Sequence, residues 1–85
     1  MALTSFFTTS SAAVDKNSAC SELVGTERWH DGNNEVPDIG NTVYLTNNSS
    51  GGTLGAGYWG AGTESGIWYQ TDSNGQVVNS GPCGL

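Results

Sequence analysis

The chain has 85 residues, with two basic against eight acidic side chains and a formal net charge of −6 at pH 7. A nucleic-acid-binding surface needs clustered lysine and arginine to replace phosphate counterions, and anionic lipid repels an acidic chain, so this composition argues against both kinds of partner. The length predicts a small domain, which buries too little surface to be very stable without a disulfide or a partner chain.

The start of the chain, residues 1–17, is predicted to be an N-terminal arm or strand ahead of a single β domain formed by residues 18–85. Its stretch 3–9, LTSFFTT, has the composition of a strand that either joins the sheet or pairs with a neighbouring molecule. No basic residue precedes the apolar stretch, so we interpret the segment as part of the mature protein and not as a signal peptide. No apolar run is long enough for insertion into a membrane.

The following elements are short and separated by turns. Residues 18–24 predict one helical turn, with Ser18 or Ser21 as its cap. Turn-forming residues then recur at roughly 8–12-residue intervals, which is typical of an all-β protein. The strands between these turns are predicted at residues 26–30, 42–46, 53–59, 67–73 and 76–80. A type I′ turn at Asn74-Gly75 joins the last two as a hairpin. We therefore predict an all-β fold, a small antiparallel meander or sandwich.

The two cysteines, Cys20 and Cys83, lie near the two ends of the predicted β domain, at a spacing that fits no zinc motif. We predict that they form one disulfide, which the chain-entropy model values at about 4 kcal/mol for a loop of this length. Two reduced, buried cysteines are the alternative if the protein stays in a cytosol.

The aromatic side chains are the candidate contact surface. Strand alternation places Val43 and Leu45 on the core face and turns Tyr44 outward, and it likewise turns Trp68 outward. Outward rings can contact a partner subunit, stack on a sugar, or pack within the molecule under the N-terminal arm. The candidates are Phe6, Phe7, Trp29, Tyr44, Tyr58, Trp59 and Trp68.

The polar residues give no catalytic pattern. His30 is the only histidine, and strand geometry prevents Glu27, His30 and Asp31 from converging, so we interpret it as a solvated strand end. Asp31, Glu35 and Asp38 crowd one loop, for which an ordinary polar loop is preferred over a weak calcium site. No nucleophile or phosphate-loop motif occurs. We predict no enzymatic activity, no cofactor and no metal.

A set of short motifs resembles modules of bacteriophage virion proteins, especially tail fibres and appendages of phages that infect cyanobacteria and other aquatic bacteria. The motifs are Ala19-Cys20-Ser21, Arg28-Trp29-His30-Asp31-Gly32, Val36-Pro37, Gly40-Asn41-Thr42-Val43-Tyr44, Leu54-Gly55-Ala56-Gly57-Tyr58-Trp59, Ile67-Trp68-Tyr69-Gln70 and Ser80-Gly81-Pro82-Cys83. The resemblance covers the chain from about Ser18 to its end. It implies a β-rich, non-enzymatic module with paired cysteines, and it transfers no catalytic or ligand-binding residue.

The expected function is assembly of a virion. The protein would be made in the host cytoplasm and act in the extracellular particle, as part of a tail appendage or as capsid decoration. Its partners would be other virion proteins and further copies of itself, contacted through outward aromatic rings and by strand addition at a sheet edge. The alternative is an adhesin module that stacks host glycans on Trp68 and Tyr44.

Overall fold

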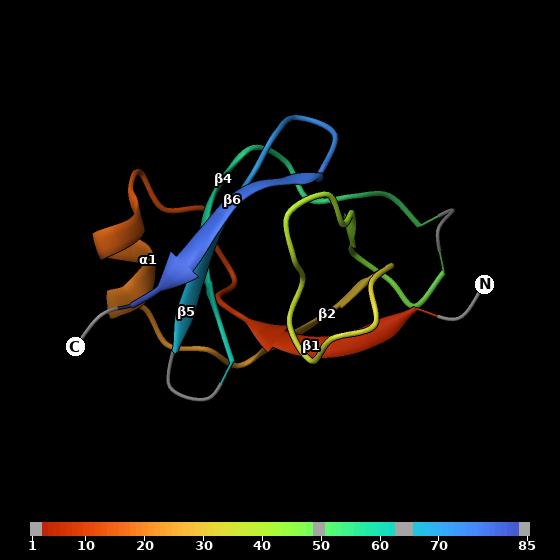
Figure 1. The fold of residues 1–85 in the computed structure, drawn as a ribbon, viewed down its shortest axis with the longest axis horizontal. Helices are drawn as coiled ribbons and strands as arrows, with labels where there is room; N and C mark the ends of the chain where they lie inside the picture. Colours follow the sequence, from red (N-terminus) through yellow and green to blue (C-terminus); the bar gives the residue numbers. More distant parts are fainter. Residues whose placement is uncertain (1–2, 49–50, 63–65, 84–85) are drawn as a thin grey trace.

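A computed structural model of the chain describes residues 3–48, 51–62 and 66–83. It confirms the all-β prediction, with a six-stranded antiparallel sheet in the order β3-β2-β1-β4-β5-β6 (Figure 1). The elements in chain order are β1 (Thr4–Thr8), α1 (Lys16–Ser21), β2 (Thr26–His30), β3 (Val43–Tyr44), β4 (Gly57–Ala61), β5 (Ile67–Thr71) and β6 (Val77–Pro82).

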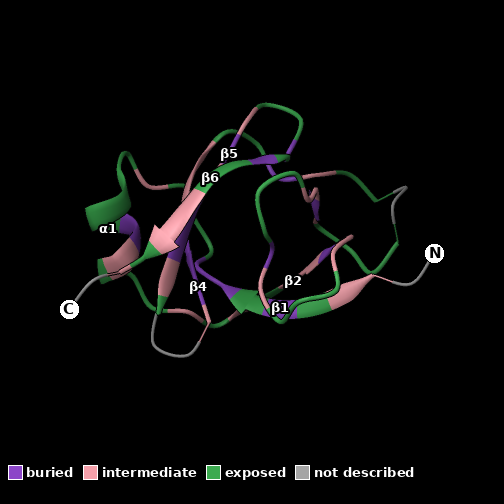
Figure 2. Cartoon of the chain, viewed as in Figure 1, coloured by how far each residue is buried: buried purple, intermediate pink, exposed green. Residues whose placement is uncertain are grey.

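The sheet curls into a half-barrel whose two edges approach each other. A bridge pairs Thr42, before β3, with Gln76, before β6. The Val43 N–H donates to the Gly75 carbonyl at 2.9 Å, which adds a second link between these edges. One cluster of buried apolar side chains fills the inside of the curl, where Figure 2 shows buried segments on several strands. They are Phe6, Val43, Leu54, Trp59, Ala61, Tyr69 and Val77.

The N-terminal segment joins the sheet and does not extend away from it. β1 pairs with β2 along its whole length, from Thr4↔His30 to Thr8↔Thr26. On its other side it pairs with β4 only at Thr8↔Ala61. The Thr8 hydroxyl reinforces this narrow junction by donating to the Gly60 carbonyl at 2.7 Å. β1 therefore connects the two halves of the sheet.

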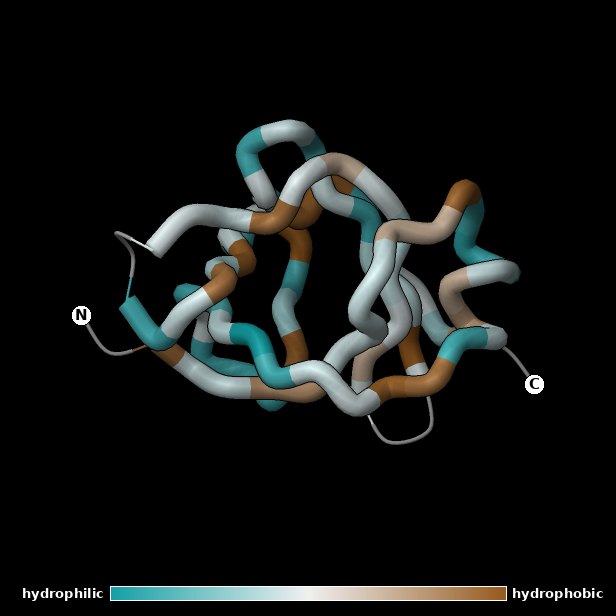
Figure 3. The backbone as a smooth tube through the Cα atoms, turned by 180° about the vertical axis from the view of Figure 1, so that it is seen from behind, coloured by the Kyte–Doolittle hydropathy of each residue, from teal (hydrophilic) through white to brown (hydrophobic). Residues whose placement is uncertain are grey.

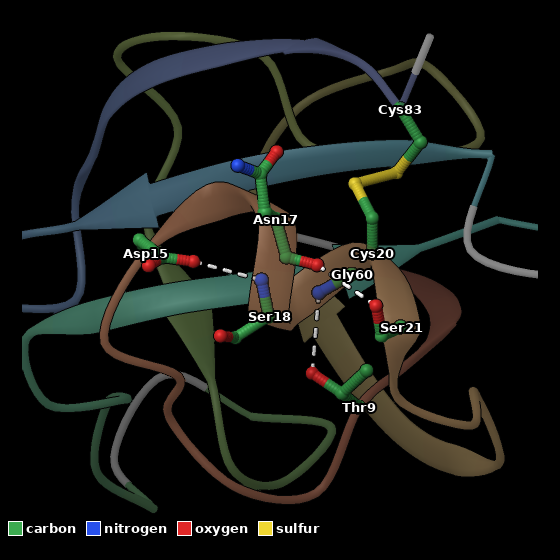
Figure 4. Close-up of a disulfide and its surroundings, with 8 residues drawn as sticks. All are labelled: Thr9, Asp15, Asn17, Ser18, Cys20, Ser21, Gly60 and Cys83. Atoms are coloured by element: carbon green, nitrogen blue, oxygen red, sulfur yellow. Dashed lines mark hydrogen bonds between the residues drawn. A yellow bond between two sulfur atoms is a disulfide. The ribbon is translucent and has the colours of Figure 1, made fainter. Parts of the chain in front are cut away.

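The helix begins earlier than predicted. Its cap is Asp15, and not Ser18 or Ser21, because the extended Asp15 backbone lets the carboxylate accept the Ser18 N–H at 2.8 Å (Figure 4). The helix ends at Ser21, short of the predicted residue 24. Its buried Ala19 faces the sheet, and α1 packs against β4 and β5.

The predicted disulfide is confirmed. Cys20 on α1 is bonded to Cys83, which follows β6, with 5.7 Å between their Cα atoms (Figure 4). Because α1 packs against β4 and β5 and Cys83 follows β6, this bond fastens the helix to that half of the sheet (Figure 1).

The β5–β6 hairpin is confirmed, but its turn is of another kind. The Gly75 N–H donates to the Asp72 carbonyl at 3.0 Å, so Ser73 and Asn74 are the central residues of the turn. The Asp72 carboxylate accepts the Asn74 N–H at 2.9 Å, and Gly75, with φ of 79°, forms the bulge that closes the loop. The type I′ prediction was wrong because this Asp side chain stabilises a longer loop.

The bounds of the last four strands also differ from the prediction, and the differences at β3 and β4 are the largest. β3 ends at Tyr44, since the Leu45 N–H bonds to the Gly52 carbonyl at 3.0 Å and turns the chain back. Leu45 is consequently exposed and not on the core face. β4 starts at Gly57, where a Cβ would lie 2.4 Å from that of Ala12, and the segment before it contributes only the bridge from Thr53 to Tyr44.

Candidate functional site

The outer face of the β4–β5 half is covered by the chain's own helix. Trp68 is 9% exposed, so the prediction that it points into solvent was wrong. The Lys16 ammonium lies 5.5 Å from the centre of the Trp68 ring, and the Tyr58 ring lies 6.0 Å from it. The indole also covers Gly81, where a Cβ would be 3.1 Å from its Nε1. The Trp68 ring therefore packs within the molecule, beneath α1, whose first residue Lys16 belongs to the predicted N-terminal segment.

Two other candidate rings belong to the core. Trp59 is buried, and its Nε1 donates to the Thr71 hydroxyl at 2.9 Å. Phe6 is buried with its ring edge-on to those of His30, at 5.3 Å, and Tyr69, at 6.0 Å. Burial also raises the pKa of the Tyr69 phenol far above its usual range. These rings stabilise the half-barrel and are not available to a partner.

Three candidate rings share the outer face of the other half of the sheet. The register places Tyr44 opposite Trp29 and Trp29 opposite Ser5, while Phe7 lies opposite Glu27. Phe7 is 56% exposed, and Trp29 and Tyr44 are partly exposed. α1 packs against β4 and β5, so no helix of the described residues lies on this face (Figure 1). We call Phe7, Trp29 and Tyr44 the open aromatic face.

The predicted pair of Trp68 and Tyr44 cannot form one sugar platform. Tyr44 lies on the outer face of β3 and Trp68 lies under α1 on β5. Alternation alone assigned both rings to an outward side, and it did not show that the two halves of the sheet are covered differently.

His30 is in the core and not at a solvated strand end. It is fully buried because its register with Thr4 and Val43 directs it into the half-barrel. Its Nδ1 accepts the Gly32 N–H at 3.1 Å, and its buried Nε2 has no hydrogen-bond partner among the residues that the structure describes. Burial lowers the pKa of His30 below the ordinary value of 6.5. Glu27 is exposed on the opposite face, so the predicted divergence of these two side chains is confirmed.

Two carboxylates of the loop after β2, those of Asp31 and Asp38, accept hydrogen bonds that hold this loop. The Asp31 carboxylate accepts the Thr42 N–H at 2.8 Å. The Asp38 carboxylate accepts from the Asn34 side-chain amide, and the Asp38 N–H donates to the Asn41 side chain at 2.8 Å. Within residues 3–48, 51–62 and 66–83, no three His, Cys, Asp or Glu side chains gather as a metal site.

The structure has a pocket beside β1 that the sequence did not predict. Its volume is about 470 Å³, and its lining residues are Ser5, Phe6, Phe7, Val24, Glu35, Val36 and Gly62. It exists because β4 pairs with only the end of β1, which is a long-range feature of the sheet. No local pattern in the sequence predicts where such a pairing stops.

Scans against protein-family models, curated proteins and solved structures each gave no match to this chain. Among the described residues, no helix has the length and apolar character needed to cross a bilayer. Hydrophobic and hydrophilic stretches instead alternate at short intervals along the chain (Figure 3).

Proposed function

We propose that the protein is a non-enzymatic assembly module of a bacteriophage virion, which binds another virion subunit through the open aromatic face. The observation that carries the proposal is the unequal covering of the sheet. The chain's own helix covers Trp68 on β5, whereas on β1–β3 Phe7 is 56% exposed and Trp29 and Tyr44 are partly exposed.

The chemistry of this face suits a protein contact. Aromatic rings bring a large contact area at a small entropy cost, and they dominate the energetic centres of protein interfaces. Full burial of one phenylalanine side chain contributes about 1.5–3 kcal/mol. Phe7 starts 56% exposed, so a partner has most of its ring left to bury.

The resemblance of residues 18 onward to phage virion modules supports the particle as the place of action. The positions that carry it include the cysteines that fasten α1 and the strand that carries Trp29. A non-enzymatic role is supported by the burial of His30, because its ring contacts Phe6 in the core, where no substrate reaches it.

A second candidate function is glycan binding by the same face. It is favoured by the register of β2 and β3, which places two partly exposed aromatic residues, Trp29 and Tyr44, directly opposite each other on neighbouring strands. Ser5 and Glu27, on the same face, supply hydroxyl and carboxylate groups for sugar hydroxyls. This candidate uses Trp29 where the sequence analysis had placed Trp68.

Site-specific photo-crosslinking distinguishes the assembly proposal from the glycan-binding candidate. A benzophenone amino acid is placed at position 7 in one variant and at position 78 in another, because Phe7 and Val78 have similar exposures of 56% and 47% but Val78 lies on β6. Illuminated virions should give a crosslink to an identified virion subunit from position 7 and none from position 78. Equal crosslinking from both positions, or none from position 7, contradicts the assembly proposal. Quenching of tryptophan fluorescence by host polysaccharide, lost in Trp29→Phe, supports the glycan candidate.

A further inference from the structure

The edge of β1 that faces β4 is only partly paired. β1 contacts β2 at five register positions, but β4 only at Thr8↔Ala61. The Phe7 carbonyl accepts the Gly62 N–H at 3.3 Å, and among residues 3–48, 51–62 and 66–83 no further backbone contact to this side of β1 follows. Sheets usually protect such an edge with lysine, proline or a bulge, and the β1 sequence TSFFT has no lysine or proline.

Strand alternation gives the direction of those β1 backbone groups that bond to no residue described in the structure. The Thr8 carbonyl accepts from Gly25 on the β2 side, whereas the Phe7 carbonyl and the Thr9 N–H bond to Gly62 and Gly60 on the β4 side. Successive residues of an antiparallel strand direct their backbone groups to opposite sides. The Phe7 N–H and both backbone groups of Ser5 therefore face the β4 side beyond the point where β4 has ended.

These groups open onto the pocket of about 470 Å³ that Ser5, Phe6 and Phe7 help to line. Val24 and Val36 give it apolar walls, and Glu35 adds a carboxylate. An added strand turns alternate side chains to opposite faces. An extended chain along this edge would thus place one set of side chains in the pocket and the other set beside Phe7.

We propose that the free edge of β1 binds an extended, basic segment of another protein by strand addition, with apolar residues in the pocket and lysine or arginine near Glu35. The argument for this occupant is charge. The chain carries a net charge of −6, Glu35 lines the pocket and Glu27 lies opposite Phe7. A second copy would bring the same negative charge and be repelled, whereas a basic strand is attracted. The inference rests on the proposed assembly function and names the chemistry of its partner.

Model peptides test the inference directly. The probe is a capped heptapeptide that alternates valine and lysine, and the matched peptides replace lysine by glutamate or carry N-methyl groups on alternate backbone nitrogens. Only the unmodified lysine peptide should bind in an NMR titration, and the amide hydrogen exchange of Ser5 and Phe7 should slow by at least about tenfold at saturation. Equal binding of the glutamate or N-methylated peptide, or no protection at Ser5 and Phe7, overturns the inference.

Two variants distinguish the effect of the Glu35 charge on peptide binding from the effect of the net charge of the protein. Glu35→Gln and Val14→Lys each raise the net charge by one unit, and Val14 is 86% exposed ahead of the helix cap, outside the pocket. We expect Glu35→Gln to lower the affinity for the lysine peptide by about three- to fivefold, and Val14→Lys to leave this affinity unchanged. Equal weakening by both variants refutes the role of Glu35. If position 7 crosslinks a virion subunit but the lysine peptide does not bind, this inference fails and the assembly function stands.

Discussion

Removal of the disulfide should take away a large part of the folding free energy. Cys20 and Cys83 are separated by 63 positions, a loop that the chain-entropy model values at about 4 kcal/mol. Native domains have about 5–15 kcal/mol in total, and small domains lie at the lower end. We therefore expect the double variant Cys20→Ala, Cys83→Ala to lose about 4 kcal/mol and to approach the limit of stable folding.

The same bond has a local consequence. α1 has six residues, and a helix this short is not stable on its own in water. The disulfide holds it against β4 and β5, where it covers Trp68. Without the bond, α1 should separate from the sheet before the half-barrel unfolds, and Trp68 should become exposed.

Urea unfolding, followed by circular dichroism and tryptophan fluorescence, measures both effects. For a small domain, a loss of about 4 kcal/mol lowers the midpoint by about 2–4 M urea. The wild type treated with dithiothreitol should match the double variant, which controls for the two alanines. A midpoint shift below about 0.5 M, or an unchanged fluorescence maximum in the native state, would refute this account of the disulfide.

Three further predictions concern the core and the turns, each measured as the free energy of unfolding in urea. Thr71→Val removes the acceptor of the Trp59 Nε1 hydrogen bond at 2.9 Å, leaves a buried donor unpaired and should cost about 1–3 kcal/mol. Gly75→Ala places a Cβ 2.6 Å from the Thr53 Cβ at a φ of +79°, and it should lower the free energy of unfolding by at least about 1–3 kcal/mol. Gly40→Ala is the control, because Gly40 has a φ of +97° but open space around it, and it should lower the free energy of unfolding by about 1 kcal/mol. Burial lowers the pKa of His30, so its contribution to stability is complete above the ordinary value of 6.5 and is lost as the pH falls from there through the folded-state pKa. The free energy of unfolding of the wild type should therefore decrease as the pH falls below about 6.5. An unchanged stability in any of these three measurements contradicts the corresponding contact.

The sequence predicted the features that depend on local chemistry or on composition. The turn residues identified an all-β chain, the spacing of Cys20 and Cys83 identified the disulfide, and the β5–β6 hairpin follows from its loop residues. The exact turn was missed because the Asp72 carboxylate accepts two backbone N–H groups, which stabilises a loop one residue longer.

The site was predicted only in part, since alternation shows which rings share a face but not what covers that face. Trp68 and Tyr44 look equivalent in the sequence, but α1 packs on β5 and not on β3. A helix of six residues has no apolar pattern long enough to predict its docking side. His30 was likewise placed in solvent because its burial depends on the pairing with Thr4 and Val43, which lie far away in the chain.

Incorporation of single variants into particles tests the assembly function most directly. Phe7→Ser removes the most exposed ring of the open aromatic face, and Val78→Ser is the control at similar exposure on β6. Loss of an aromatic side chain at the centre of an interface costs about 2 kcal/mol or more, which weakens binding by about 30-fold. Quantitative mass spectrometry of purified virions should therefore find Phe7→Ser strongly depleted and Val78→Ser at the wild-type level. Equal amounts of the two variants in the particle would contradict the account.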